Sequence, residues 1–116
     1  AHIAKSMAFI TAEGPILVVT AGDMKIDNPK FKACFHQKAK MIAPPDLPDL
    51  IGHEMGGVCP FAVNGGVKTY LDVSLKRFDI VYPAAGNAAS AIKLTIAELE
   101  KFSRFVEWVD VCKPYE

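Results

Sequence analysis

Residues 56–60 read Gly-Gly-Val-Cys-Pro, a short loop whose main chain is suited to holding a reacting oxygen. The glycines Gly56 and Gly57 let the backbone approach a ligand closely. They can also adopt positive φ values that other residues disfavour. Pro60 withdraws one N–H donor and stiffens the exit. Main-chain groups of such a loop can hold a water and an oxyanion without side-chain reorganisation. An ordinary tight turn is the more usual explanation of the same pattern.

A lysine near the start of the chain is the second candidate for chemistry. If residues 3–10 form a strand, Ile3, Lys5, Met7 and Phe9 share one face. A lysine among three apolar neighbours must extend to the strand edge, pair with an anion or line a cavity. The residues alone slightly favour the first of these.

Cys59 invites a thiol-nucleophile hypothesis with His53 as its base. Against it, a free cysteine is usually a small buried hydrophobe, and nothing in the sequence brings His53 near. The three histidines and three cysteines show no metal-ligand spacing, so no metal site is predicted. No phosphate-binding or dinucleotide-binding glycine motif occurs, and no cofactor is expected.

The segment at residues 83–90, Pro-Ala-Ala-Gly-Asn-Ala-Ala-Ser, has almost no side-chain bulk. It leaves room for a flat ligand such as a nucleobase or ribose, with Asn87 as the amide that would hydrogen-bond it. A turn with a small-residue packing contact explains it equally well.

Charge is balanced over the chain but not along it. Thirteen basic and thirteen acidic residues cancel, which excludes a uniformly basic nucleic-acid coat. Residues 25–40 nevertheless hold five lysines and one acid, while residues 98–116 hold five acids and three bases. The lysine-rich stretch could contact a phosphate backbone, although a solvated helix face is favoured from charge alone.

The composition is that of a packed globular domain, with 116 residues, 51% hydrophobic, 22% charged and a mean hydropathy of +0.20. No uncharged apolar run approaches the roughly eighteen residues that a membrane span requires. Three cysteines without a C-x-x-C pair favour a reducing cytoplasm. We expect one domain over 1–116, with no signal peptide and with some upstream segment missing, since the chain opens directly in strand-like sequence without Met.

Hydrophobic periodicity and turn residues predict about seven short strands and three helices. Asp27 and Pro29 indicate a helix start, and Thr95 with Glu98 forms a capping box for a helix that buries Ile96, Leu99 and Phe102. The expected class is α+β with a curved, mixed, barrel-like sheet. Strands are predicted at 3–10, 16–20, 40–42, 67–71, 79–82, 91–94 and 105–111 (an edge strand), and helices at 30–36, 44–50 and 96–104, with turns in 52–66 and 74–77.

Several segments, in order and spacing, resemble the YbaK/ProX family of aminoacyl-tRNA deacylases, related to the editing insertion of bacterial prolyl-tRNA synthetases. The resemblance covers about residues 3–104 and rests on six segments: Ala4-Lys5-Ser6-Met7, Gly14 to Val19, Gly52-His53-Glu54, Gly56 to Phe61, Tyr70-Leu71-Asp72 and Tyr82 to Asn87. The family normally has a further helical segment before the first strand, and we expect that segment to be missing upstream of residue 3.

The resemblance implies metal-free hydrolysis of the ester that joins a wrong amino acid to the 3′ end of a tRNA. It places the family's essential lysine at Lys5 and its glycine-proline loop at Gly56, Gly57, Val58, Cys59 and Pro60. It also implies that substrate is bound by His53, Ala85, Gly86 and Asn87. An aminoacyl ester is already activated, so a positioned water and an oxyanion donor suffice.

The expected substrate is a small amino acid on tRNA-Pro or a related tRNA, and the expected partner is the mischarged tRNA, with no membrane. An aminoacyl-tRNA synthetase and a second copy of the chain are further partners that the resemblance leaves open. Two other functions remain open from the residues: a non-catalytic module that binds tRNA ends or nucleotides, and the Cys59 thiol enzyme.

Overall fold

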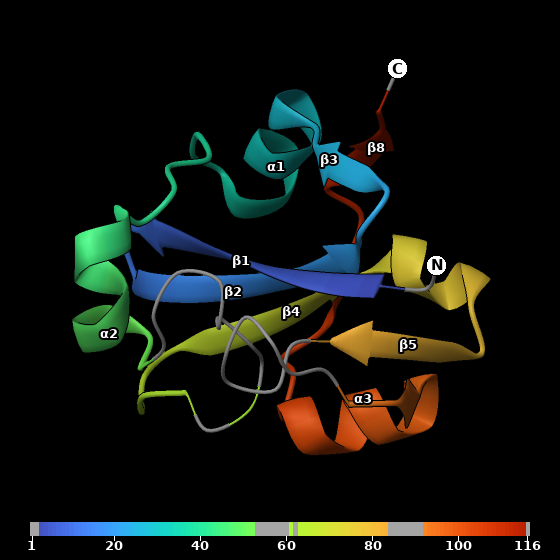
Figure 1. Ribbon diagram of the computed structural model, residues 1–116. Coiled ribbons are helices and arrows are strands. Elements are labelled where there is room, and N and C mark those ends of the chain that lie inside the picture. The colour runs from blue at the N-terminus through green and yellow to red at the C-terminus, as the bar shows by residue number, and fades with distance from the viewer. Residues whose placement is uncertain (1–2, 53–60, 62, 84–91, 116) are drawn as a thin grey trace.

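A computed structural model describes residues 3–52, 61, 63–83 and 92–115 of the chain. Six of its strands form one mixed sheet in the order β6-β5-β1-β2-β4-β7, and β3 and β8 form a separate antiparallel ribbon (Figure 1). The elements are β1 Ile3–Thr11, β2 Gly14–Ala21, β3 Met24–Ile26, α1 Asn28–Phe35, the 3-10 helix η1 Pro44–Asp46, α2 Leu47–Leu50, β4 Lys68–Asp72, the 3-10 helix η2 Val73–Arg77, β5 Ile80–Pro83, β6 Leu94–Thr95, α3 Ile96–Ser103, β7 Trp108–Val109 and β8 Cys112–Pro114.

The centre of the sheet is the β1–β2 hairpin, which sequence patterning predicts well. Its β-branched run pairs antiparallel with β1 in a register that places Lys5 opposite Thr20. Thr11 holds the turn, since its hydroxyl donates to the Gly14 carbonyl over 2.7 Å. Gly14 has a φ of 115°, a conformation that favours glycine. β5 pairs with β1 and β4 pairs with β2, both in parallel, so the sheet is mixed as expected.

Helices cover both faces of this sheet. On one face, Phe31 of α1 is buried against Phe9, with ring centroids 5.0 Å apart. On the other face, Leu99 of α3 packs with Leu71 and other core residues, while α2 covers a neighbouring part of the core. In Figure 1, α1 and the β3–β8 ribbon lie above the sheet, α2 lies at its left end and α3 lies below it.

The predicted helix starts are confirmed. The Asp27 side chain accepts from the Lys30 N–H at the start of α1, and Thr95 and Glu98 form the reciprocal capping box of α3. The expected face of α3 is wrong in one position, because Phe102 is 52% exposed. Ser103, one residue further around the helix, takes the buried place instead.

Three predicted strands are wrong in length. Residues 40–42 contribute only a single bridge, from Met41 to Phe9. Of the described residues 92–94 only Leu94 lies in a strand, and within 105–111 only Trp108–Val109 does, although β7 does lie at the sheet edge. Such short pairings depend on what the chain meets across the sheet, which local alternation does not encode.

Candidate active site

Lys5 lies in β1, in the middle of the six-stranded sheet, where its side chain shares a face with Thr20. The side chain is half-buried. Alternation along β1 puts Ala4 on the opposite face, where it belongs to the core cluster beneath α3. The sequence prediction that Lys5 has apolar neighbours on its face is confirmed for Met7 and Phe9, which pack into the cluster beneath α1.

The partner of the Lys5 ammonium is a phenol. Lys5 Nζ donates to the Tyr115 hydroxyl oxygen over 2.9 Å and lies 4.9 Å from the centroid of the same ring. The described residues form two ion pairs, Lys30–Asp110 and Arg77–Asp23, and neither includes Lys5. An ammonium has three N–H donors, so a single phenol leaves capacity for an anionic or carbonyl oxygen of a substrate.

A buried carboxylate anchors the segment that carries Tyr115. Asp72 is 1% exposed, and its two oxygens each accept a backbone N–H over 2.9 Å, from Val111 and from Ser74. Hydrogen bonds to a charged acceptor are among the strong ones in proteins. Asp72 thereby joins the end of β4 to Val111, the residue before β8. Tyr115 follows β8 and contacts Lys5, 110 residues away in sequence.

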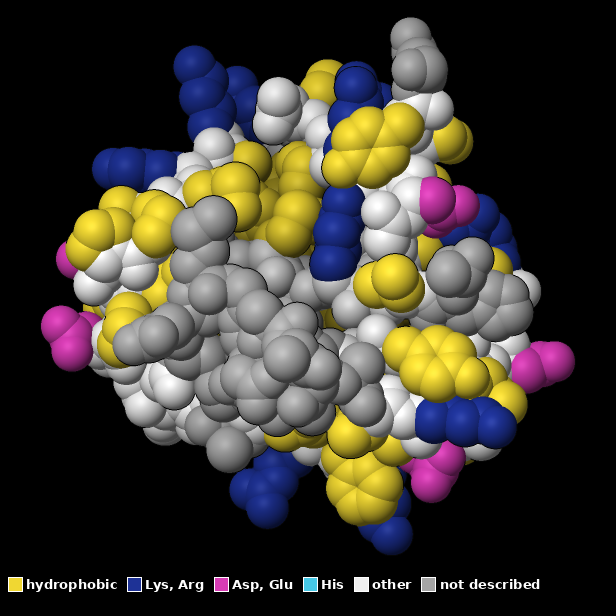
Figure 2. Space-filling view, in the orientation of Figure 1, with side chains coloured by type: hydrophobic (Ala, Val, Ile, Leu, Met, Phe, Trp, Pro, Cys, Tyr) yellow, Lys and Arg dark blue, Asp and Glu magenta, His cyan; other side chains and the backbone are white. Residues whose placement is uncertain are grey.

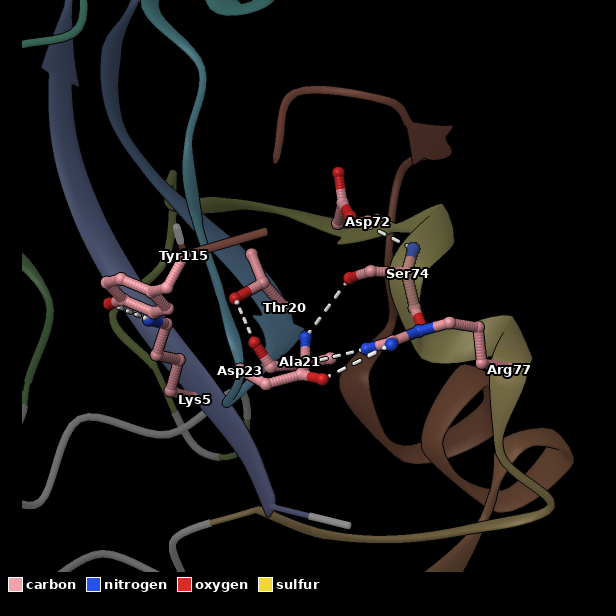
Figure 3. A network of polar contacts seen from close by, with 8 residues as sticks. All are labelled: Lys5, Thr20, Ala21, Asp23, Asp72, Ser74, Arg77 and Tyr115. Carbon is pink, nitrogen blue, oxygen red and sulfur yellow. Dashed lines mark hydrogen bonds and ion pairs between the residues drawn. The ribbon is translucent and has the colours of Figure 1, made fainter. Parts of the chain in front are cut away.

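A chain of polar contacts continues from Asp72 to the end of β2. The Ala21 N–H donates to the Ser74 hydroxyl over 3.2 Å, and Thr20 Oγ1 donates to the Ala21 carbonyl over 3.1 Å. Arg77 donates to the Ser74 carbonyl over 3.0 Å and forms a two-pronged contact with Asp23. In Figure 3, Lys5 and Tyr115 lie at one side of this network, and Ser74 and Arg77 at the other.

The Asp23–Arg77 ion pair is at the surface, and each side chain stabilises the charged form of the other. The hydrogen bond from Arg77 is the main cause that lowers the pKa of Asp23, and the same bond raises the pKa of Arg77. Both side chains are largely exposed, so this pair contributes little to stability. Beside it lies an open depression of about 560 Å³, lined in the described chain by Arg77, Phe78, Asp79, Ile80, Tyr82 and Lys93 but not by Lys5.

The two cysteines that the structure describes are free but poorly suited to nucleophilic work. Burial, followed by the charge of Asp72, raises the pKa of the Cys112 thiol to about 12, while nearby Lys5 acts in the opposite direction. Burial also raises the pKa of Cys34. Within the described residues, no group of three or more His, Cys, Asp or Glu side chains is placed to hold a metal ion.

Most of the predicted site residues lie outside the described residues. These are His53, Gly56, Gly57, Val58, Cys59, Pro60, Ala85, Gly86 and Asn87, so their roles stay predictions. The Cys59 thiol hypothesis stays untested for the same reason. Of the predicted site, the structure describes Lys5 alone.

The residues that border the two predicted loops can be placed relative to the sheet. Pro83, which precedes residues 84–91, pairs with Ala4, and its carbonyl accepts the Ile92 N–H over 3.2 Å. Phe61, which follows residues 53–60, packs against the core cluster that contains Ala4. Gly52, on the other border, has a φ of 103°. The border at Pro83 therefore lies next to Ala4, the chain neighbour of Lys5, whereas Phe61 packs with the cluster beneath α3, on the face opposite the Lys5 side chain.

Sequence reasoning missed Tyr115. The tyrosine follows Pro114, outside any recognisable motif, and only the pairing of β8 with β3 brings it to Lys5. No spacing in the sequence signals a contact between residues 5 and 115.

A family model for the aminoacyl-tRNA editing domain matches residues 1–102. The chain belongs to the aminoacyl-tRNA editing domain family. Lys5 lies inside the matched range and Tyr115 lies beyond it. The YbaK-type resemblance that the sequence motifs indicate is thereby confirmed.

This editing domain has relatives that are similar in sequence or in fold. The Bacillus subtilis (strain 168) protein YwhH, itself uncharacterised, is 51% identical over 117 residues, which cover 99% of this chain and 74% of YwhH. A crystal structure of a protein proposed to be a trans-editing enzyme for prolyl tRNA synthetase is 25% identical, with a TM-score of 0.87 over 97% of this chain and 71% of that one. The hypothetical protein APE2540 shares the fold, with a TM-score of 0.83, 23% identity and coverage of 97% and 75%.

No helix among the described residues of this editing domain is long and apolar enough to cross a membrane.

Proposed function

We propose that this editing domain is an aminoacyl-tRNA deacylase that hydrolyses the ester between a wrongly attached amino acid and the 3′ end of a tRNA. Water adds to the ester carbonyl, and the resulting tetrahedral intermediate expels the ribose hydroxyl. The products are the free amino acid and a tRNA with its terminal hydroxyl restored. The family match over residues 1–102 carries this proposal.

The contacts of Lys5 support a role at the RNA end. Its ammonium is held by Tyr115 without a carboxylate partner among the described residues, so its positive charge is available to an anion. A lysine suits phosphate as a compact point charge. In this proposal Lys5 binds the terminal phosphate or the ribose region of the tRNA.

The remaining roles fall on the predicted loops. The main chain of Gly56–Pro60 orients the water and the ester carbonyl, and Asn87, with Ala85, Gly86 and His53, seats the terminal adenosine. Pro83, which borders the second of these loops, pairs with Ala4, the chain neighbour of Lys5, and this supports placing that loop near Lys5. Main-chain donors stabilise a developing oxyanion without having to reorganise. Such a reaction of an activated ester needs no metal ion.

The proposed substrate is a small amino acid on tRNA-Pro or a related tRNA, and the proposed location is the cytoplasm. The structural neighbour proposed to be a trans-editing enzyme for prolyl tRNA synthetase supports this choice of tRNA. A pocket excludes a residue that is too large far better than one that is slightly too small, so we expect size to set the specificity. A transient association with prolyl-tRNA synthetase would fit the same role.

The test is a deacylation screen. tRNA-Pro mischarged with alanine, cysteine or serine is mixed with the protein, with and without a chelator, beside correctly charged prolyl-tRNA. We expect release of at least one small amino acid, unaffected by the chelator, and much slower release of proline. Binding of these tRNAs without release of any amino acid would instead identify a non-catalytic module and would overturn the proposal.

A further inference from the structure

Two lysines lie over the exposed ring of Tyr115, and a third pairs with one of them across the β3–β8 ribbon. Lys5 Nζ lies 4.9 Å and Lys25 Nζ 5.9 Å from the ring centroid. Lys113 is directly opposite Lys25 in the antiparallel β3–β8 ribbon. In the space-filling view, basic and hydrophobic side chains adjoin in the upper part of the molecule, where β1 meets this ribbon (Figure 2). We call these four residues the Tyr115 cluster.

The Tyr115 cluster carries positive charge that the described residues do not neutralise. Their two ion pairs use Lys30 and Arg77, neither of which belongs to the cluster. Like charges directly opposite one another in an antiparallel pair are destabilising, and Lys25 and Lys113 form such a pair. An anion bound between them would relieve that repulsion.

The ring adds a second kind of recognition to the charge. Tyr115 is 58% exposed, and its hydroxyl oxygen accepts a hydrogen bond from Lys5 that holds the ring in place. Exposed aromatic rings beside cationic side chains are the usual means of binding single-stranded nucleic acid, because a base stacks on the ring while phosphates meet the cations. An acidic peptide without aromatic side chains would use the lysines but would have no group to stack on the ring.

We propose that the Tyr115 cluster binds the single-stranded 3′ end of an RNA, with a base stacked on Tyr115 and phosphates at Lys25 and Lys113. This inference rests on the proposed function, because it makes the cluster the approach to Lys5. It extends that function to β3, β8 and Tyr115, and the last two lie beyond the residues that the family model matches.

The experiment measures binding of RNA that carries no amino acid. The probes are a fluorescent RNA hairpin with a four-nucleotide 3′ overhang ending in CCA, and the same hairpin with a blunt end. The proteins are the wild type, the double variant Lys25→Gln/Lys113→Gln, and Tyr115→Leu. Affinity is measured by anisotropy between about 50 and 200 mM salt, where phosphate contacts are most visible.

The matched controls are Lys101→Gln and Phe102→Leu. Lys101 Nζ lies 5.6 Å from the Phe102 ring centroid, and this ring is also exposed, but the pair is on α3, away from the Tyr115 cluster in Figure 1. These variants remove a lysine or a ring of the same kind from another surface. Thermal unfolding of each variant verifies that it is folded.

We expect the double lysine variant to bind the overhang hairpin about tenfold more weakly, with the slope of log K against log salt smaller by about 1.4. We expect Tyr115→Leu to lose about tenfold in affinity with a nearly unchanged slope. The blunt hairpin should bind weakly to all proteins, and both α3 controls should match the wild type.

Equal binding of the overhang hairpin by the wild type and all cluster variants would overturn the inference. So would losses no larger than those of the α3 controls, or variants that lose binding to anionic vesicles while RNA binding is unchanged. Because the RNA carries no aminoacyl ester, the outcome is independent of deacylation. A protein that fails the deacylation screen but shows the expected cluster dependence would contradict the proposed function and leave this inference standing.

Discussion

Two of the places where a lysine lies over an aromatic ring, at Tyr115 and at Trp108, differ in how the charge is balanced. In the Tyr115 cluster, Lys5 and Lys25 lie over one ring with no carboxylate pair among the described residues. On the other side of the sheet, Lys76 lies 4.6 Å from the Trp108 ring, but the indole N–H donates to Glu100 over 3.0 Å. We call the second group, with Phe105 packed edge-on against it, the Trp108 cluster.

The comparison separates a structural contact from a candidate binding site. A cation over a ring contributes about 0.5–1 kcal/mol at an exposed position wherever it occurs. In the Trp108 cluster the anion that completes the arrangement comes from α3 of the same chain. In the Tyr115 cluster no such group is present in the described chain, so the completing anion is expected to come from a ligand.

The largest expected effect comes from replacing Asp72, the buried carboxylate that holds the segment leading to Tyr115. Asp72→Asn replaces one acceptor oxygen by an amide that faces a backbone N–H donor, from Val111 or Ser74. We expect the free energy of unfolding to fall by about 3 kcal/mol and the melting temperature by about 10 °C, as denaturant and thermal unfolding would show.

Asp110→Asn is the matched control for Asp72→Asn. Asp110 is an exposed carboxylate in the ion pair with Lys30, and its loss should cost less than about 1 kcal/mol. Equal stability losses in the two variants would contradict the anchoring role of Asp72. RNA affinity should fall more for Asp72→Asn, because Asp72 accepts the Val111 N–H directly, whereas Asp110 acts on this segment through exposed Lys30, which also donates to the Cys112 carbonyl.

Alkaline pH should lower the stability of the folded protein through ionisation of Cys112. Its pKa is about 12 in the folded protein against 9.0 for an ordinary thiol, so the folded state favours the neutral thiol. Below pH 9 the thiol is neutral in both states and stability does not depend on its ionisation. As the pH rises from 9 towards 12, the thiol ionises in the unfolded protein but not in the folded one, so the folded state loses stability. We expect the free energy of unfolding to fall there by up to about 1.4 kcal/mol per pH unit from this group.

Cys112→Ala isolates that contribution. The variant should show a shallower fall in stability above pH 9, whatever its stability at neutral pH. An identical slope in both proteins would mean that Cys112 ionises equally easily in the folded and unfolded states.

Tyr115→Phe should divide the two roles of the tyrosine. The ring remains for stacking, but the oxygen that accepts from Lys5 is lost. We expect RNA affinity to stay within about twofold while kcat for deacylation falls about fivefold, the value of one modest hydrogen bond. A fall in affinity with kcat unchanged would show that the hydroxyl binds RNA rather than positioning Lys5.

Changes in the Trp108 cluster should affect stability alone. Trp108→Phe removes the hydrogen bond to Glu100 and should lower the free energy of unfolding by about 1 kcal/mol. Deacylation and RNA affinity should not change. A loss of RNA affinity would place this cluster in the binding surface and remove the distinction between the two.

Local signals in the sequence predict the elements that are held by local contacts. The β-branched run of β2, the Asp27 cap of α1 and the capping box of α3 all form as expected. The short ribbon β3–β8 was missed, because three-residue strands far apart in the chain carry no alternation of their own. Pro114 also argues against a strand when only the sequence is considered.

The same limit applies to the candidate site. Lys5 could be singled out because a charged side chain interrupts an apolar face, and the family resemblance gave it a role. Tyr115, Lys25 and Lys113 could not be connected with it, since their proximity arises from the pairing of β8 with β3 and from the buried Asp72. Recognising such a cluster requires the tertiary structure.

The most direct test of the account is single-turnover deacylation of one mischarged tRNA by Lys5→Ala and Lys76→Ala side by side. Both substitutions remove a lysine that lies over an aromatic ring. We expect Lys5→Ala to slow release of the amino acid by about 100-fold or more, and Lys76→Ala to stay within about twofold of the wild type. Wild-type release by a folded Lys5→Ala protein would contradict the central claim that this ammonium serves the reaction.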